Sequence, residues 1–162
     1  MVGKVFPDTG GVPVPKRHPA RQKYRLLEIE RFGKKLNLKI NKQPKFFPPK
    51  DPHKAALFTI ATIMNGQNLN FGKEVLTKLW ADEQDISQDA VLEDICKKLD
   101  INFNELKKQA DSDEIKNIYA SNSQEAIDKG VFGAPSFIID NELFWGQDRL
   151  DFLEDKIKSI LN

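Results

Sequence analysis

The feature of this sequence that most constrains its fold is the run GVFGAPSFII at residues 130–139. Apolar residues recur with the helical period of 3.6 before this run, and with a period near two after Gly133. The segments PSFIID and ELFWG therefore predict two short strands, joined by a tight turn at Asp140 and Asn141. Pro135 opens the first strand, where a proline removes a ladder hydrogen bond, so its position needs a specific backbone reason.

The rest of the chain is predicted to be mostly helical. Apolar spacing, capping residues and terminal glycines indicate helices over residues 19–36, 52–66, 70–84, 87–100, 102–111, 112–130 and 147–162. The second of these helices is apolar nearly all round its centre and should be buried. The residues expected to face inward on the third and the last helix are Val75, Leu76, Leu79, Trp80, Leu150, Leu153, Ile157 and Leu161.

The sequence also suggests where the chain divides. Residues 1–15 contain three prolines and two adjacent glycines, and they are predicted to be an irregular lead-in. Residues 16–130 would form a helical domain, and residues 131–162 a strand-strand-helix portion. A chain of 162 residues is long enough for one domain, or for one domain with an insertion.

Composition narrows the class of protein and its location. No apolar run approaches the roughly 18 residues of a membrane span, and no signal peptide is recognisable, so no membrane partner is expected. The single cysteine, Cys96, excludes an intrachain disulfide and fits a reducing compartment, so a cytoplasmic location is expected. Cys96 lies on the inward stripe of its helix and should be a buried structural thiol. His18 and His53 stand beside prolines without other ligating residues, so no metal site is expected.

Charge is unevenly distributed along the chain. Residues 1–54 carry 14 Lys and Arg against 4 Asp and Glu, whereas residues 55–162 carry 11 against 20. A basic segment of this kind can bind nucleic acid, but this one contains no nucleic-acid-binding motif. We therefore expect a solvated basic face, or a pocket for a small anionic molecule, and no nucleic-acid partner.

The order helix, glycine, Ala-Pro, strand, hairpin, strand and helix is that of the C-terminal half of a thioredoxin-like fold. The run GVFGAPSFIIDNELFWGQDRLDFLE resembles the C-terminal signature of bacterial 2-hydroxychromene-2-carboxylate isomerases, which are relatives of kappa-class glutathione transferases in the DsbA-like thioredoxin superfamily. The likeness continues backward through LWADEQDIS, HPARQKYRLLEIERF and FPDTGGVPVPKR. It implies an α/β, thioredoxin-like (DsbA-like) fold with a large all-helical insertion.

The resemblance also implies a site for glutathione. Pro135 would follow a cis peptide bond, and the backbone of Ala134 would then face the cysteinyl part of glutathione as an added strand would. Asp148 and Arg149 would lie near the γ-glutamyl ammonium and carboxylate. The segment that matches the family's glutathione contacts is Trp145, Gly146, Gln147 and Asp148. Gly10 and Gly11 would contact the substrate, although FPDTGG stands here where many relatives have FKATGN.

Each of these residues also has a purely structural interpretation. Trp145 could be a core or lid residue, Asp148 a helix cap, and Arg149 a surface arginine. Relatives carry a catalytic serine just after a first strand, in a run like FDFxSPYSY, and no such run occurs here. We therefore expect the chain to lack the first β-α-β unit, and we assign no catalytic residue within it. The missing strand would have paired with residues 135–140, so we expect a second copy or the helical insertion to cover that edge.

The function that the resemblance implies is glutathione-dependent cis/trans isomerisation of a small aromatic or unsaturated carboxylate, as in the catabolism of aromatic compounds. In such an enzyme the serine hydroxyl would stabilise the glutathione thiolate, and that thiolate would add reversibly to the substrate. As it stands, this chain should be a homodimer with little activity of its own. The alternatives are a kappa-like glutathione transferase, a DsbA-family thiol-disulfide oxidoreductase, which needs a C-x-x-C pair, and a non-catalytic binding module.

Overall fold

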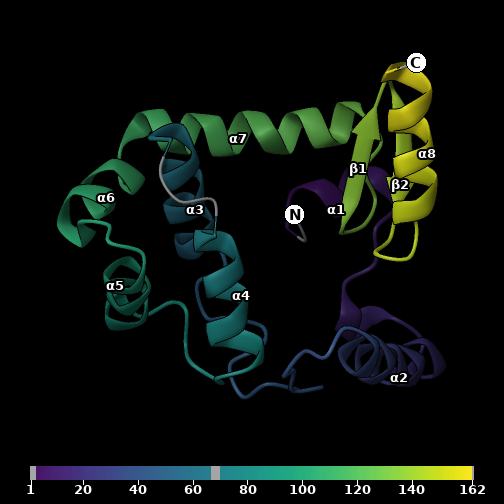
Figure 1. The fold of residues 1–162 in the computed structure, drawn as a ribbon, viewed down its shortest axis with the longest axis horizontal. Coiled ribbons are helices and arrows are strands. Elements are labelled where there is room, and N and C mark those ends of the chain that lie inside the picture. The colour runs from purple at the N-terminus through teal and green to yellow at the C-terminus, as the bar shows by residue number, and fades with distance from the viewer. Residues whose placement is uncertain (1–2, 67–69, 162) are drawn as a thin grey trace. The chain divides into compact units, whose positions relative to one another are not determined.

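The computed structural model describes residues 3–66 and 70–161 of the chain, and Figure 1 shows its helices and strands. The elements are α1 (Val5–Thr9), a 3-10 helix (Val14–Lys16), α2 (Pro19–Lys35), α3 (Lys54–Met64), α4 (Phe71–Trp80), α5 (Asp89–Lys98), α6 (Phe103–Ala110), α7 (Asp113–Asp128), β1 (Ser136–Ile139), β2 (Glu142–Trp145) and α8 (Leu150–Leu161). The chain forms two compact units, one of residues 1–17 with 120–162 and one of residues 18–119. No helix in the described part of the chain is both long and apolar enough to cross a membrane.

The unit of residues 18–119 has a core built from α3, α4, α5 and α6. The largest side chains in this core, each at most 1% exposed, are Phe58, Phe71, Leu92, Ile95 and Leu106. Asp89 of α5 pairs with Lys54 of α3 and with Lys107 of α6, at 2.6 Å each, and so links three helices. The side chain of Asn102 accepts hydrogen bonds from two backbone N–H groups in the first turn of α6, as its position in the sequence predicts.

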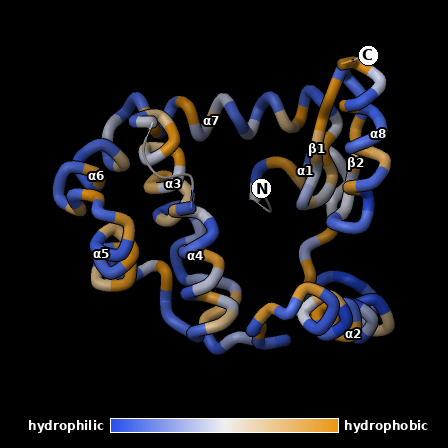
Figure 2. The backbone as a smooth tube through the Cα atoms, in the orientation of Figure 1, coloured by the Kyte–Doolittle hydropathy of each residue, from blue (hydrophilic) through white to orange (hydrophobic). Residues whose placement is uncertain are grey.

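The other unit contains the hairpin. β1 and β2 pair antiparallel with Phe137 opposite Phe144, and β1 is a nearly continuous hydrophobic stretch in Figure 2. Asp140 and Asn141 form the predicted tight turn, with φ values of 54° and 61° that match the left-handed residues of a type I′ turn. Lys156 of α8 lies 3.8 Å from the carboxylate of Asp140 and therefore ties the turn to the helix.

Residues 1–15 were predicted to be an irregular lead-in, but part of this segment is helical. It contains α1 and most of the 3-10 helix. Pro7 is compatible with α1 because it lies in the first turn, where backbone N–H groups have no partner inside the helix. Val5 and Phe6 anchor the helix, since they are only 2% and 7% exposed. The predicted domain limits at residues 16 and 131 stay a prediction. The compact units divide between residues 17 and 18 and again within α7, between residues 119 and 120.

The burial pattern differs from the prediction in three helices. Leu76 of α4 is 58% exposed because Phe71, Val75 and Leu79, four residues apart, form the inward stripe instead. Ile63 and Met64 at the end of α3 are exposed, so that helix is buried only along one side. The residues of α8 predicted to face inward include Leu150, Ile157 and Leu161, which are all exposed.

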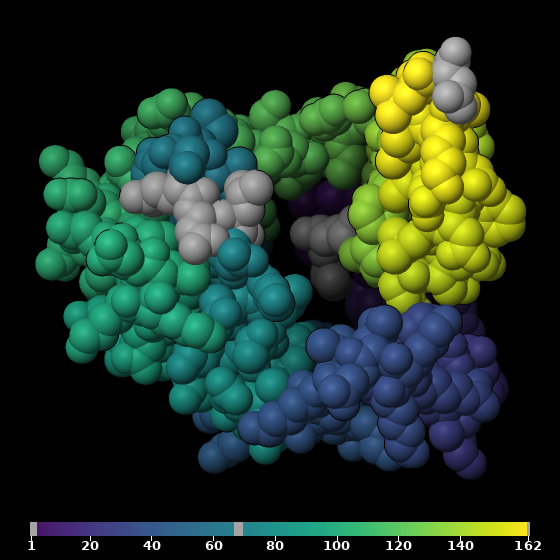
Figure 3. All heavy atoms as spheres, viewed as in Figure 1, coloured from purple at the N-terminus to yellow at the C-terminus, as the bar shows by residue number. Residues whose placement is uncertain are grey.

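α8 has no buried residue, and its side chains form an outer surface of their unit in Figure 3. The physical reason is the size of the sheet beneath it. Apolar spacing determines which side of a helix can be buried, but burial itself requires a surface large enough to cover that side. The described residues provide a sheet of two four-residue strands, which is too small for a twelve-residue helix.

Candidate functional site

The predicted site residues meet at the open end of the hairpin, formed by residues 132–135 and 145–149, which we call the hairpin mouth. The peptide bond between Ala134 and Pro135 is cis. The N–H of Gly146 donates to the carbonyl of Pro135 at 3.0 Å and extends the strand pairing beyond Ser136. Because Pro135 has no N–H, this pair of residues shares a single hydrogen bond. Two segments ten residues apart in the sequence are thereby held side by side.

Trp145 closes one side of the hairpin mouth. Its indole nitrogen packs directly against Gly133, where any side chain would overlap it. Its ring also meets the ring of Phe132 edge-on, with centroids 4.9 Å apart. Trp145 is nevertheless 46% exposed, so it is a boundary residue of the site and does not belong to the buried core.

The backbone of Ala134 is free to bind a ligand. Ala134 and Pro135 are exposed, and within residues 3–66 and 70–161 no group bonds to the N–H or C=O of Ala134. The turn is held from behind, because the hydroxyl of Ser136 donates to the carbonyl of Gly133 at 2.8 Å. Backbone groups presented in this way can pair with an extended peptide.

Asp148 and Arg149 supply charge at the start of α8. An Nη1 atom of Arg149 lies 3.1 Å from the Asp148 carboxylate, and both side chains are half exposed. Among the described residues, Nε and Nη2 of Arg149 have no partner, so the guanidinium can still donate hydrogen bonds to a second anion. Gly146 is buried with φ of 119°, and a side chain there would overlap the Asp148 carboxylate. Gln147 is exposed beside them.

The two glycines predicted to contact substrate differ in position. Gly11 packs against the ring of Phe6 and the carbonyl of Phe132, so the lead-in reaches the hairpin mouth at this residue. Gly10 caps α1 with φ of 77°, and a side chain there would meet nothing within 4 Å. Phe132, which touches both Trp145 and Gly11, was not among the predicted site residues. Its place between Gly130 and Gly133 in the sequence was the signal that could have found it.

Cys96 is remote from this chemistry. It lies in α5, is fully buried, and belongs to the core of the unit of residues 18–119. Burial raises the pKa of the Cys96 thiol to about 11, so little of it is thiolate at neutral pH. These properties fit the predicted structural thiol and not a redox nucleophile. No group of three or more His, Cys, Asp or Glu residues that could hold a metal ion occurs in the described part of the chain.

Comparison with known proteins agrees with this architecture. Residues 3–158 match the family described as DSBA-like thioredoxin domain. The chain belongs to this family. The DsbA-like thioredoxin fold predicted from the sequence is thus confirmed, as a mostly helical chain with a C-terminal hairpin and a final helix.

Two further similarities connect this DSBA-like thioredoxin domain with isomerases. A 36-residue segment is 53% identical to 2-hydroxychromene-2-carboxylate isomerase of Sphingobium xenophagum, and this segment is 22% of the chain and 18% of that relative. A solved structure of a 2-hydroxychromene-2-carboxylate isomerase superposes with a TM-score of 0.77 over 99% of this chain and 78% of the other, at 17% identity. The sequence match thus spans less than a fifth of the relative's length, and the structural match establishes the fold.

Proposed function

We propose that this chain carries the glutathione-binding part of a glutathione-dependent cis/trans isomerase acting on a small aromatic or unsaturated carboxylate. Membership of the DSBA-like family and the similarity to proteins named 2-hydroxychromene-2-carboxylate isomerase support this proposal. The observation that carries it is the hydrogen bond between Gly146 and Pro135. That bond holds an unpaired backbone segment beside a pair of opposite charges.

The residues of the hairpin mouth fit glutathione in chemical terms. The free N–H and C=O of Ala134 suit the backbone of the cysteinyl residue. The carboxylate of Asp148 suits the γ-glutamyl ammonium, and the unoccupied N–H groups of Arg149 suit the γ-glutamyl carboxylate. The exposed indole of Trp145 would cover the ligand from one side.

Glutathione, when bound, would supply a thiol nucleophile for reversible addition to an unsaturated substrate. The chain's own residues bind and orient that group through Ala134, Asp148 and Arg149. The hydroxyl of Ser136 is committed to the carbonyl of Gly133, and we assign it to the turn and not to activation of a thiol. We assign no catalytic residue within the chain, and we expect it to have little activity on its own.

The residues of this chain do not support all of the alternatives equally. A thiol-disulfide oxidoreductase of the DsbA class needs a reactive cysteine pair, whereas this chain has one cysteine, which is buried and has a raised pKa. A kappa-like transferase would use the same glutathione contacts with a different second substrate. A non-catalytic binding module would not require the unpaired backbone of Ala134 beside the ion pair of Asp148 and Arg149.

Titration of the chain with glutathione, followed by NMR, tests this proposal. Shifts should centre on the amides of Ala134 and of residues 147–149. Asp148→Asn and Arg149→Met should each weaken binding about tenfold, since each removes one charge-assisted hydrogen-bond partner. Asp151→Asn is a matched control, because it removes the same charge from the first turn of the same helix outside the proposed contacts. Binding that is equally sensitive to Asp151→Asn, or absent from the wild type, would contradict the proposal.

We also propose a cytoplasmic location, on the basis of the single cysteine, and no nucleic-acid partner. We also propose a homodimer. The register directs the N–H and C=O groups of Ser136 and Ile138 away from β2, and this free edge of β1 can pair with a second copy of the chain. Sedimentation equilibrium of the chain, with and without glutathione, tests the oligomeric state directly. A monomer at all concentrations would rule the dimer out.

A further inference from the structure

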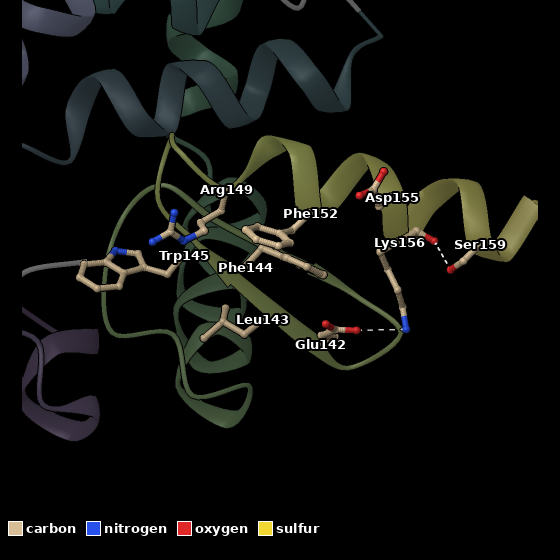
Figure 4. A pocket seen from close by; sticks show the side chains of 9 residues that line it. All are labelled: Glu142, Leu143, Phe144, Trp145, Arg149, Phe152, Asp155, Lys156 and Ser159. Atoms are coloured by element: carbon tan, nitrogen blue, oxygen red, sulfur yellow. Dashed lines mark hydrogen bonds and ion pairs between the residues drawn. The ribbon is translucent and has the colours of Figure 1, made fainter.

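A groove lies between β2 and α8 and meets the hairpin mouth at Trp145 and Arg149. Its volume is about 480 Å³, and Figure 4 shows the side chains that line it. The lining residues are Glu142, Leu143, Phe144, Trp145, Arg149, Phe152, Asp155, Lys156 and Ser159. This volume is within the usual range for ligand sites.

The position of the groove on β2 is unusual. All four residues of the strand, 142–145, line it, although successive side chains of a strand point to opposite faces of a sheet. Only the edge of a strand is shared by residues of both faces. The groove therefore runs along the edge of β2 that is not paired with β1.

The pairing register shows which backbone groups face this edge. Gly146 and Pro135 form a hydrogen-bonded pair. In an antiparallel ladder every second pair is of this kind, so the pairs Phe137–Phe144 and Ile139–Glu142 are hydrogen-bonded as well. The N–H and C=O groups of Leu143 and Trp145 consequently point away from β1, toward the groove. They present a row of donors and acceptors to which another strand can pair.

The side chains along the groove differ from one end to the other. Phe144 and Phe152 lie at its centre in Figure 4, where Phe144 is buried and Phe152 is 61% exposed. At the end nearest the hairpin turn lie Glu142, Asp155 and Lys156. The ammonium of Lys156 is 3.1 Å from the Glu142 carboxylate, whereas Asp155 has no hydrogen bond or ion pair among the described residues.

We propose that this groove binds an extended peptide as an added strand along β2. An apolar or aromatic side chain of the peptide would lie over Phe144 and Phe152, and a basic side chain would meet Asp155. The row of free backbone groups favours a peptide over a compact small molecule, because it provides hydrogen bonds at alternate residues. At the turn end the carboxylates of Asp140, Glu142 and Asp155 outnumber the ammonium of Lys156, which favours a basic side chain there, whereas Arg149 lines the other end of the groove.

This site adjoins the proposed glutathione site, because Trp145 and Arg149 border both. The free groups of Ala134 lie just before β1, whereas those of Leu143 and Trp145 lie on the outer edge of β2. The backbone hydrogen bonds proposed along β2 use neither the cis peptide bond nor the Asp148 carboxylate. The two ligands would approach each other at Trp145 and Arg149, so each is titrated alone.

A fluorescein-labelled peptide, Lys-Thr-Phe-Thr-Lys, tests the inference by fluorescence anisotropy with the full chain. Lysines two residues on either side of the phenylalanine allow either strand direction, because alternate residues share a face. We expect Phe152→Ala to weaken binding about tenfold through loss of apolar contact. Asp155→Lys should weaken binding of this peptide and strengthen binding of Glu-Thr-Phe-Thr-Glu. Leu161→Ala is the matched control, since Leu161 is 79% exposed on the same helix and outside the groove.

Backbone pairing has its own signature. On binding, the amides of Leu143 and Trp145 should become protected from hydrogen exchange, while that of Phe144, already paired with β1, should not change. Two further peptides would each be N-methylated on one of the two alternating sets of amides. Only one of them should still bind, because only one set of peptide N–H groups faces β2. Equal binding of both methylated peptides, no protection at Leu143, or no anisotropy change at millimolar protein would each overturn the inference. None of these outcomes decides whether glutathione binds, which the NMR titration measures on its own.

Discussion

The N–H of Gly146 donates to the carbonyl of Pro135 at 3.0 Å, and this one bond sets the geometry of both proposed sites. It holds residues 145–149 beside Ala134 at the hairpin mouth. It also determines, through strand alternation, that Leu143 and Trp145 direct their backbone groups to the outer edge of β2. A substitution at Gly146 or Pro135 should therefore change the geometry of both the hairpin mouth and the groove.

Gly133→Ala should disturb the hairpin mouth. A side chain at residue 133 would overlap the Trp145 indole, and Trp145 can move only by leaving Phe132. We expect the free energy of unfolding to fall by about 1–3 kcal/mol, as for other substitutions that overpack a contact. Trp145 fluorescence during urea unfolding would measure this, in a Trp80→Phe background that leaves a single tryptophan.

Gly72→Ala is a suitable control for that substitution. Gly72 lies in α4, and a Cβ there would meet Thr59 at an ordinary 3.4 Å. Alanine should therefore stabilise the helix by about 0.5–1 kcal/mol relative to glycine. If both substitutions changed the free energy of unfolding alike, the contact between Gly133 and Trp145 would not hold the hairpin mouth together.

Gly146→Ala should act on the charged end of the hairpin mouth. Its φ of 119° is poorly accessible to a residue with a side chain, and the new methyl group would displace the Asp148 carboxylate. We expect glutathione binding to weaken at least as much as with Asp148→Asn, together with a loss of stability of about 1–3 kcal/mol. Isothermal titration and thermal unfolding of the same sample would separate the two effects, and unchanged binding would remove Asp148 from the site.

Cys96 should make the stability depend on alkaline pH. Burial raises its pKa in the folded chain to about 11, above the ordinary value of a thiol. The unfolded chain therefore loses this proton first as pH rises, so the stabilisation is complete below about pH 8.5 and is lost toward pH 11. Urea unfolding between pH 8 and 11 should show a steeper loss for the wild type than for Cys96→Ala. Parallel slopes would contradict a buried, protonated thiol.

Asp89 should have the opposite dependence, at acid pH. Hydrogen bonds from Lys107 and Lys54 lower its pKa below the usual range, so its stabilisation is present above about pH 4 and is lost as pH falls through the lowered value. Because the side chain is 43% exposed, we expect Asp89→Asn to cost only about 1 kcal/mol at pH 7, and progressively less as the pH falls below about 4. Asp113→Asn, at a 98% exposed position, should leave the free energy of unfolding unchanged at each pH and serves as the control.

Local sequence signals predicted the elements and their caps well. Asn102 caps α6, Gly130 ends α7 with positive φ, and Asp140 with Asn141 forms the turn. These features depend on residues within a few positions of one another, so neighbouring side chains and backbone preferences decide them. The same holds for the change from helical to strand spacing after Gly133. Proximity in the sequence was sufficient for all of them.

Burial and long-range contact were not predictable in this way. Leu76 satisfied the apolar pattern of α4, but Phe71 occupied the inward position against Phe58, at a ring distance of 6.4 Å. The prolines of residues 1–15 predict irregular structure, whereas the burial of Val5 and Phe6 stabilises a helix that includes Pro7. Phe132 became a neighbour of Gly11 only because two segments more than a hundred residues apart pack together.

The sequence by itself determined the family, the order of the elements and the choice of Ala134, Pro135 and residues 145–149 as candidate site residues. It did so because periodicity, capping and turn preferences are local, and because a family motif preserves residue types at set spacings. Only the tertiary structure decided which of those residues touch, and that Asp148 meets Arg149 while Ala134 stays unpaired. It also decided that β2 keeps a free edge beside Phe152. Such outcomes depend on how distant surfaces match in shape and size, which no short window of sequence contains.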